Sequence, residues 1–171
     1  QGATLVECEI PNTDKYGDTE LEVLLCELKA DLNAYLAEFA PTASVKNLAD
    51  IIAYNQTNRA RVMPYFGQEL FMQAQAKAGL DGKAYLDALA TNHRYARQEG
   101  IDKVLREAKV TALIAPTSGP AWLTDLVNGD SFGTSFTTPA AVAGYPHVTV
   151  PMGAVAGLPV GLSFVGTAFT D

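Results

Sequence analysis

The sequence predicts an α/β fold, because segments with helical periodicity alternate with short apolar segments that are typical of strands. Apolar residues recur at helical spacing from Leu21 to Phe39, which indicates a helix with one packing face. The short apolar runs at 110–115 and 160–165 indicate strands that are buried on both faces. We therefore expect a sheet with helices on both of its sides.

The first part of the chain is predicted to contain one strand followed by helices. Residues 4–10 alternate partly between apolar and polar side chains and end at a proline, as a strand would. Thr19 and Glu22 have the spacing of a capping box, so a helix is expected from Thr19 to the residue before Pro41. Gly100 should interrupt the last helix. Further helices are predicted for residues 44–58, 67–78 and 82–108.

The second part of the chain is predicted to be strands joined by a long loop. Besides the strands named above, residues 147–150 should form a strand, and residues 139–143 a short helix closed by Gly144. Residues 116–138 are rich in Gly, Ser, Thr and Pro and hold the single tryptophan, Trp122. Loops of this length are usually functional or disordered.

Composition excludes several classes of function. A net charge of -7 and a pI near 4.7 argue against a nucleic-acid-binding surface, which needs clustered Lys and Arg. No apolar run reaches the length of a membrane span, and no signal-peptide pattern opens the chain. Cys8 and Cys26 lack metal-site or redox spacing, so we expect free, buried thiols and a cytoplasmic protein.

The sequence offers no complete set of catalytic or metal-binding residues. His93 and His147 have no acidic or cysteine partner at ligand spacing, so we expect no metal, and no phosphate loop or other motif indicates a cofactor. The nucleophile elbow G-x-S-x-G is absent. Ser118 follows a predicted buried strand, yet no base lies near it in sequence to activate its hydroxyl, so we interpret it as a loop serine.

Several ordered motifs identify a family. They are Leu-Ile-Ala-Pro-Thr at 113–117, Thr-Pro-Ala-Ala-Val-Ala-Gly-Tyr-Pro at 138–146, Val-Thr-Val-Pro-Met-Gly at 148–153 and Gly-Leu-Pro-Val-Gly-Leu-Ser-Phe-Val-Gly at 157–166. This tail resembles the C-terminal region of the amidase-signature family, and segments 44–50, 66–69 and 99–102 look like its peptide-amidase branch. The resemblance implies that residues 1–171 are the C-terminal portion of a single amidase-signature domain. The partial fold would then hold a mixed β-sheet flanked by helices on both faces, with the N-terminal catalytic half absent.

The resemblance implies hydrolysis of carboxylic or peptide amides by a nucleophilic serine, assisted by a second serine and a lysine. In the family these residues lie upstream, around a Gly-Ser-Ser-Gly-rich segment. This sequence has no Ser-Ser dipeptide, and none of its lysines lies in the family's catalytic context. We therefore expect no catalytic residue in this chain, no activity by the chain alone, and contact with the missing half or with another copy. Two alternatives stay open: a non-catalytic structural or binding module, and one chain of a two-piece amidase.

Four residues are candidates for contact with an amide substrate. In relatives that act on glutaminyl-tRNA, an Asp five residues before the proline of the tail motif reads the substrate, and here that position is Thr134. Thr134 and Phe136 would then line a more neutral pocket. Trp122 and Phe66 are further candidates, because aromatic side chains commonly line small-molecule sites. The alternative for all four is packing within the core or the loop.

Overall fold

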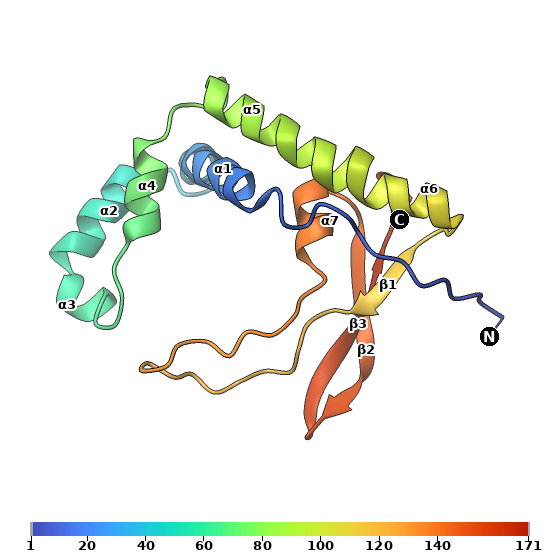
Figure 1. Ribbon diagram of the computed structural model, residues 1–171. Coiled ribbons are helices and arrows are strands. Elements are labelled where there is room, and N and C mark those ends of the chain that lie inside the picture. Colours follow the sequence, from blue (N-terminus) through green and yellow to red (C-terminus); the bar gives the residue numbers. More distant parts are fainter. Residues whose placement is uncertain (1, 171) are drawn as a thin grey trace. The chain divides into compact units, whose positions relative to one another are not determined.

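The computed structural model describes residues 2–170 and confirms the α/β class (Figure 1). Its elements are α1 (Gly17–Phe39), α2 (Leu48–Thr57), α3 (Arg59–Val62), α4 (Glu69–Ala76), α5 (Lys83–Asn92), η1 (His93–Ile101), α6 (Asp102–Ala108), β1 (Leu113–Pro116), α7 (Thr138–Ala143), β2 (His147–Val155) and β3 (Leu158–Val165). The chain divides into two compact units, residues 18–90 and residues 2–17 with 91–170. Each unit has its own core.

The helical unit, residues 18–90, is built around the apolar face of α1. One part of this face, including Cys26, packs with Tyr85 and Ala88 of α5. A second part, around Leu25, packs with Leu48 of α2 and Ala74 of α4. The helical spacing of the leucines therefore predicted this packing face only in part. Leu25 and Leu36 are buried, but Leu21, Leu24 and Phe39 are 43%, 55% and 67% exposed.

Two predicted helix starts are wrong by a few residues. Helix α1 begins at Gly17, so Thr19 lies inside it, and Glu22 forms an ion pair with Lys77 instead of completing a capping box. Helix α2 begins at Leu48, and its N-terminal cap is Asn47, whose side-chain oxygen accepts the Asp50 backbone N–H at 2.9 Å. Asn and Ser are nearly equally favourable as N-terminal caps, so the residue types alone did not show whether Ser44 or Asn47 caps this helix.

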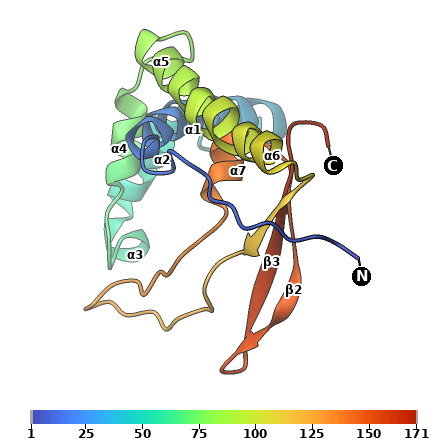
Figure 2. The same cartoon turned by 45° about the vertical axis from the view of Figure 1, so that its right-hand side comes forward.

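The sheet unit, residues 2–17 and 91–170, contains three antiparallel strands in the order β1-β3-β2. Leu113 and Val165 lie opposite each other on one face, where they join a core with Ile101, Ala140 and other apolar residues. The helices of this core are η1, α6 and α7 (Figure 2).

The other sheet face differs from the expectation of helices on both faces. On that face Ile114, Phe164 and Val148 are cross-strand neighbours, and they are 43%, 40% and 57% exposed. The described strand pairs are all antiparallel, so the mixed sheet expected for the larger domain is not formed by these residues alone.

Two predictions for the N-terminal segment are wrong. Residues 4–10 form neither a helix nor a strand and belong to no sheet. Cys8 on this segment is exposed and free, whereas Cys26 is free and buried as expected. A partly alternating pattern indicates an extended backbone, but it does not supply the neighbouring strand that a ladder requires.

The predicted interruption at Gly100 is confirmed. Gly100 has φ -114° and ψ -111° and lies in the π-helical turn η1 between α5 and α6. A side chain there would place its Cβ 2.4 Å from the carbonyl oxygen of Tyr95, so only glycine fits. Helix α7 ends as predicted at Gly144, which adopts the left-handed conformation with φ 64°.

Candidate functional site

The long loop between β1 and α7 is closed at its base by backbone hydrogen bonds. Ser118 and Ser135 form a β-bridge, and the Gly119 N–H donates to the Thr134 carbonyl oxygen at 3.2 Å. The Phe136 N–H donates to the Thr117 carbonyl oxygen at 2.9 Å. Residues 119–134 therefore form an arm that leaves the sheet and returns to it, as both ribbon views show (Figures 1 and 2).

The arm has internal structure of its own. Asp125 accepts the backbone N–H groups of Val127 and Asn128, each at 2.9 Å, and these hydrogen bonds lower the pKa of the Asp125 carboxyl. The Trp122 and Phe132 rings meet edge to face with their centroids 5.7 Å apart. The arm also carries apolar side chains that are at least 65% exposed: Leu123, Leu126, Val127 and Phe132.

A row of hydroxyl groups crosses the sheet at the base of the arm. Ser163 Oγ donates to Thr117 Oγ1 at 2.9 Å, and Thr117 Oγ1 is 2.7 Å from Thr149 Oγ1. His147 Nε2 is 2.5 Å from Ser163 Oγ. The row requires Gly161, because a Cβ there would lie 2.5 Å from Thr149 Oγ1 and 2.8 Å from Thr117 Oγ1.

The pair His147–Ser163 is close enough for a base and a nucleophile, yet the burial of Ser163 excludes that role in this chain. Ser163 is 0% exposed, so no substrate reaches its oxygen here. The row therefore holds the three strands and the base of the arm in place.

The hydroxyl row was missed by reasoning from the sequence. Thr149 and Ser163 interrupt strands that are otherwise apolar, and Thr117 follows β1 directly. This signal was available, but only the pairing of β3 with both of its neighbours shows that these side chains meet.

Three of the four predicted substrate-contact residues lie on the arm or at its base. Trp122 is 41% exposed, Thr134 is exposed, and Phe136 is half-buried and packs on the core of the sheet unit. Phe66 lies in the helical unit and is 80% exposed. Trp122, Thr134 and Phe136 therefore lie on the arm or at its base, and their contact with a substrate stays a prediction.

Ser118 has no activating group among its hydrogen-bond partners. Its hydroxyl donates to the Gly119 carbonyl oxygen at 3.3 Å, as a loop serine would. Among residues 2–170 no group of three or more His, Cys, Asp or Glu side chains is placed to hold a metal ion. In the same part of the chain no helix combines the length and the apolar character needed to cross a membrane.

Comparison with known proteins identifies the family. The sequence profile of the family described as Amidase matches residues 1–171. The chain belongs to this amidase family. A solved peptide amidase in complex with the competitive inhibitor chymostatin is 44% identical, with a TM-score of 0.92 over 99% of this chain. The native peptide amidase from Stenotrophomonas maltophilia is 43% identical, with a TM-score of 0.85 over 95% of this chain.

The amidase chain described here is much shorter than these relatives. It covers 34% of the inhibitor-bound peptide amidase and 32% of the Stenotrophomonas maltophilia enzyme. A probable amidase of Arabidopsis thaliana is 34% identical over 86% of this chain, and the matched region is 26% of that protein. The chain therefore spans about a third or less of the length of the relatives it matches, and it matches part of the amidase-signature fold.

Proposed function

We propose that this chain is the C-terminal portion of a single amidase-signature domain that hydrolyses carboxylic or peptide amides and works in the cytoplasm. The observation that carries the proposal is the likeness to peptide amidases at 44% identity and a TM-score of 0.92 over nearly the whole chain. In this proposal the nucleophilic serine, the second serine and the lysine lie outside the chain. The lysine accepts the nucleophile's proton through the second serine, and backbone N–H groups stabilise the oxyanion.

In this proposal the chain supplies one wall of the substrate cleft. The hydroxyl row fixes the base of the arm, and the arm presents Trp122 and Thr134, with Phe136 at its base. Phe66, in the helical unit, is a separate candidate for substrate contact. Thr134 is uncharged, so the pocket suits a neutral amide and does not recognise an ammonium group at this position. The exposure of Trp122 and Thr134 in the present structure supports this role, because a wall residue must be accessible to substrate.

A chimaera tests the proposal directly. The segment of the Stenotrophomonas maltophilia peptide amidase that matches this chain is replaced by residues 1–171, and ammonia release from a peptide amide is measured. We expect hydrolysis by the chimaera. The Trp122→Ala chimaera should have a KM raised by about tenfold, because one aromatic contact with bound substrate is lost. Leu123→Ala, a neighbouring exposed change, is the matched control.

The chain by itself provides the opposite test. We expect the pure 171-residue polypeptide to release no ammonia from a peptide amide and to remain unlabelled by a serine-directed fluorophosphonate. Turnover by the chain alone, or covalent labelling at Ser118, would show that the catalytic residues lie within it. An inactive, well-folded chimaera would instead favour the non-catalytic module.

A further inference from the structure

The arm, residues 119–134, combines exposed apolar side chains with negative charge. Its sequence contains two aspartates, Asp125 and Asp130, and no Lys, Arg or His. Four of its apolar side chains are at least 65% exposed, as described above. A negatively charged surface of this kind attracts cations, and its apolar side chains favour a cation that is carried on an apolar stem.

The two aspartates of the arm differ in how their oxygens are used. Asp125 Oδ1 accepts two backbone N–H groups, and Asp125 Oδ2 accepts the side-chain amide of Asn128 at 2.7 Å, so both oxygens close the turn. The Asp130 carboxylate accepts one hydrogen bond, from the indole N–H of Trp122 at 3.3 Å. Within residues 2–170 no Lys or Arg forms an ion pair with Asp130, which is exposed. The charge of Asp130 is therefore available to a ligand.

The hydrogen bond from Trp122 holds an aromatic ring beside this charge. The N–H group is the only hydrogen-bond donor of the indole, so the ring offers its faces for any further contact. The Trp122 and Phe132 rings lie at 83° to each other and are 41% and 65% exposed. The face of an aromatic ring carries partial negative charge and attracts cations. An exposed aromatic pair and an available carboxylate therefore lie together on the arm.

The chemical group that fits these features is a guanidinium. It is planar and weakly hydrated, it stacks on aromatic faces, and it forms hydrogen-bonded ion pairs with carboxylates. The methylene stem of an arginine side chain can also lie along apolar surface. An ammonium group could pair with Asp130 but could not stack on the Trp122 ring. An arginine side chain therefore matches the carboxylate, the aromatic ring and the apolar surroundings together.

We propose that Asp130 and Trp122 form a subsite that selects peptide amides with an arginine side chain close to the amide that is hydrolysed. We call this pair the arginine subsite. The inference rests on the proposed function, because the arm meets substrate only if it is a wall of the cleft. Thr134, at the base of the arm, is uncharged and suits the neutral amide group, whereas Asp130 lies farther out and binds the cationic side chain. Asp130 then determines specificity and takes no part in the bond-breaking step.

Direct binding to the 171-residue chain tests the arginine subsite without any catalysis. Trp122 is the single tryptophan, so its fluorescence reports on the subsite itself. The two ligands are N-acetyl-arginine amide and N-acetyl-citrulline amide, which have similar shapes but differ in charge. At low ionic strength we expect the Kd of the arginine amide to be at least about fivefold lower than that of the citrulline amide. Added salt should reduce this difference, because an exposed ion pair is screened.

Two matched variants separate the subsite from the general charge of the arm. Asp130→Asn keeps an acceptor for the Trp122 N–H and removes one negative charge, so it should make the two Kd values equal. Asp125→Asn removes the same charge from the same arm, and asparagine can still close the turn. Because the Asp125 oxygens are used within the arm, this variant should keep the preference for the arginine amide.

The chimaera with the Stenotrophomonas maltophilia peptide amidase tests the same subsite during hydrolysis. Ammonia release is measured for two dipeptide amides that differ only in arginine against citrulline. We expect kcat/KM to be at least about fivefold higher for the arginine substrate, through a lower KM, because the subsite binds a side chain that does not react. Asp130→Asn should remove this preference, and Asp125→Asn should retain it.

The outcomes distinguish the inference from the proposed function. A preference for arginine that Asp130→Asn removes and Asp125→Asn retains supports the arginine subsite. Equal Kd values for the two ligands overturn it, and so does an equal loss of preference in both variants, which would show attraction by net charge alone. A chimaera that hydrolyses both dipeptide amides equally well also overturns it, yet leaves the proposed function standing. Preferential binding with a chimaera that hydrolyses neither substrate supports the subsite and argues against the proposed function.

Discussion

Asn12 should contribute to stability in two separable ways, through its side-chain amide and through its backbone conformation. It has φ 65°, in the left-handed region, and its Nδ2 donates to the Glu99 carbonyl oxygen at 3.0 Å. A hydrogen bond of this kind contributes about 0.5–1.5 kcal/mol. The left-handed conformation costs about 1–2 kcal/mol in residues other than Gly, Asn and Asp. Asn12→Ala should therefore lower the free energy of unfolding by about 2–3 kcal/mol.

The glycine variant separates the two contributions. Asn12→Gly loses the same hydrogen bond but accepts the positive φ without strain. It should be more stable than Asn12→Ala by roughly 1 kcal/mol, after the larger unfolded-state entropy of glycine is included. The assay is urea unfolding followed by circular dichroism at the helix band. With a slope of about 2 kcal/mol per molar urea, Asn12→Ala should lower the midpoint by about 1 M.

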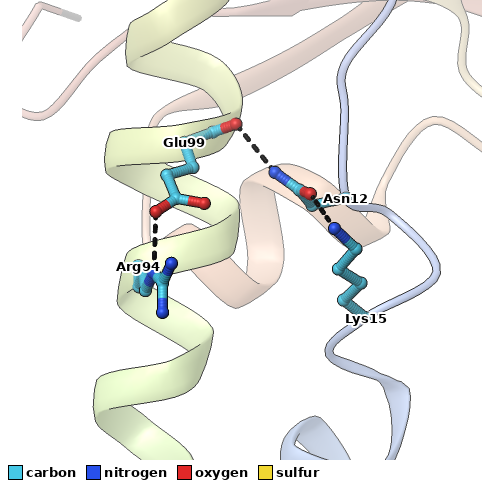
Figure 3. Close-up of polar contacts among 4 residues, drawn as sticks. All are labelled: Asn12, Lys15, Arg94 and Glu99. Carbon is cyan, nitrogen blue, oxygen red and sulfur yellow. Dashed lines mark hydrogen bonds and ion pairs between the residues drawn. The ribbon is translucent and has the colours of Figure 1, made fainter.

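Two results would refute this reasoning about Asn12. Equal midpoints for Asn12→Ala and Asn12→Gly would show that the backbone conformation is not held in solution. A wild-type midpoint for both variants would show that the Asn12–Glu99 hydrogen bond drawn in Figure 3 does not stabilise the fold. Alkylation of Cys8 provides a local readout, because a released segment should expose that thiol further.

The other predictions concern the hydroxyl row and one tyrosine. Ser163→Ala should lower the free energy of unfolding by about 1–3 kcal/mol, because His147 and Thr117 both lose their hydrogen bond to the buried Ser163 hydroxyl. A urea midpoint equal to wild type would contradict this. Gly161→Ala should lower the free energy of unfolding by about 1–3 kcal/mol in the same assay, because the added Cβ would lie 2.5 Å from Thr149 Oγ1. An unchanged free energy of unfolding would show that the hydroxyl row can move to accommodate the methyl group. The hydrogen bond to Glu27, with burial, raises the pKa of Tyr85 to about 12, so stability from this contact is present below about pH 10 and is lost as pH rises through 12. In a phenolate absorbance titration Tyr85→Phe should remove one late-titrating phenol, and an unchanged curve would refute the assignment.

Local sequence signals predicted most of the elements. The helical spacing of leucines defined α1, the short apolar runs defined β1 and β3, and Gly144 marked the end of α7. These features depend on neighbours within a few residues, which the sequence displays directly. Element boundaries were less accurate where polar side chains had distant partners, as with Glu22 and its ion pair with Lys77.

For the candidate site, the sequence predicts the long loop and proposes Trp122, Thr134 and Phe136 as contact residues. The structure places these residues on one arm or at its base, and their contact with a substrate stays a prediction. The hydroxyl row at the base of that arm was not predicted. Its members are Thr149 of β2, Ser163 of β3 and Thr117, which follows β1 directly, so they meet only when β3 pairs with both β1 and β2.

The sequence by itself determined the family, the α/β class and the absence of a Ser-Ser dipeptide from this chain, because each depends on the order of residue types. Only the tertiary structure decided that residues 4–10 stand apart from the sheet and that Ile114 and Phe164 lie on an exposed sheet face. The physical reason is that a strand forms its backbone hydrogen bonds with a neighbouring strand, which can lie far away in the sequence. The sequence of a segment therefore indicates whether it can form a strand, but only the tertiary structure shows whether another strand lies beside it.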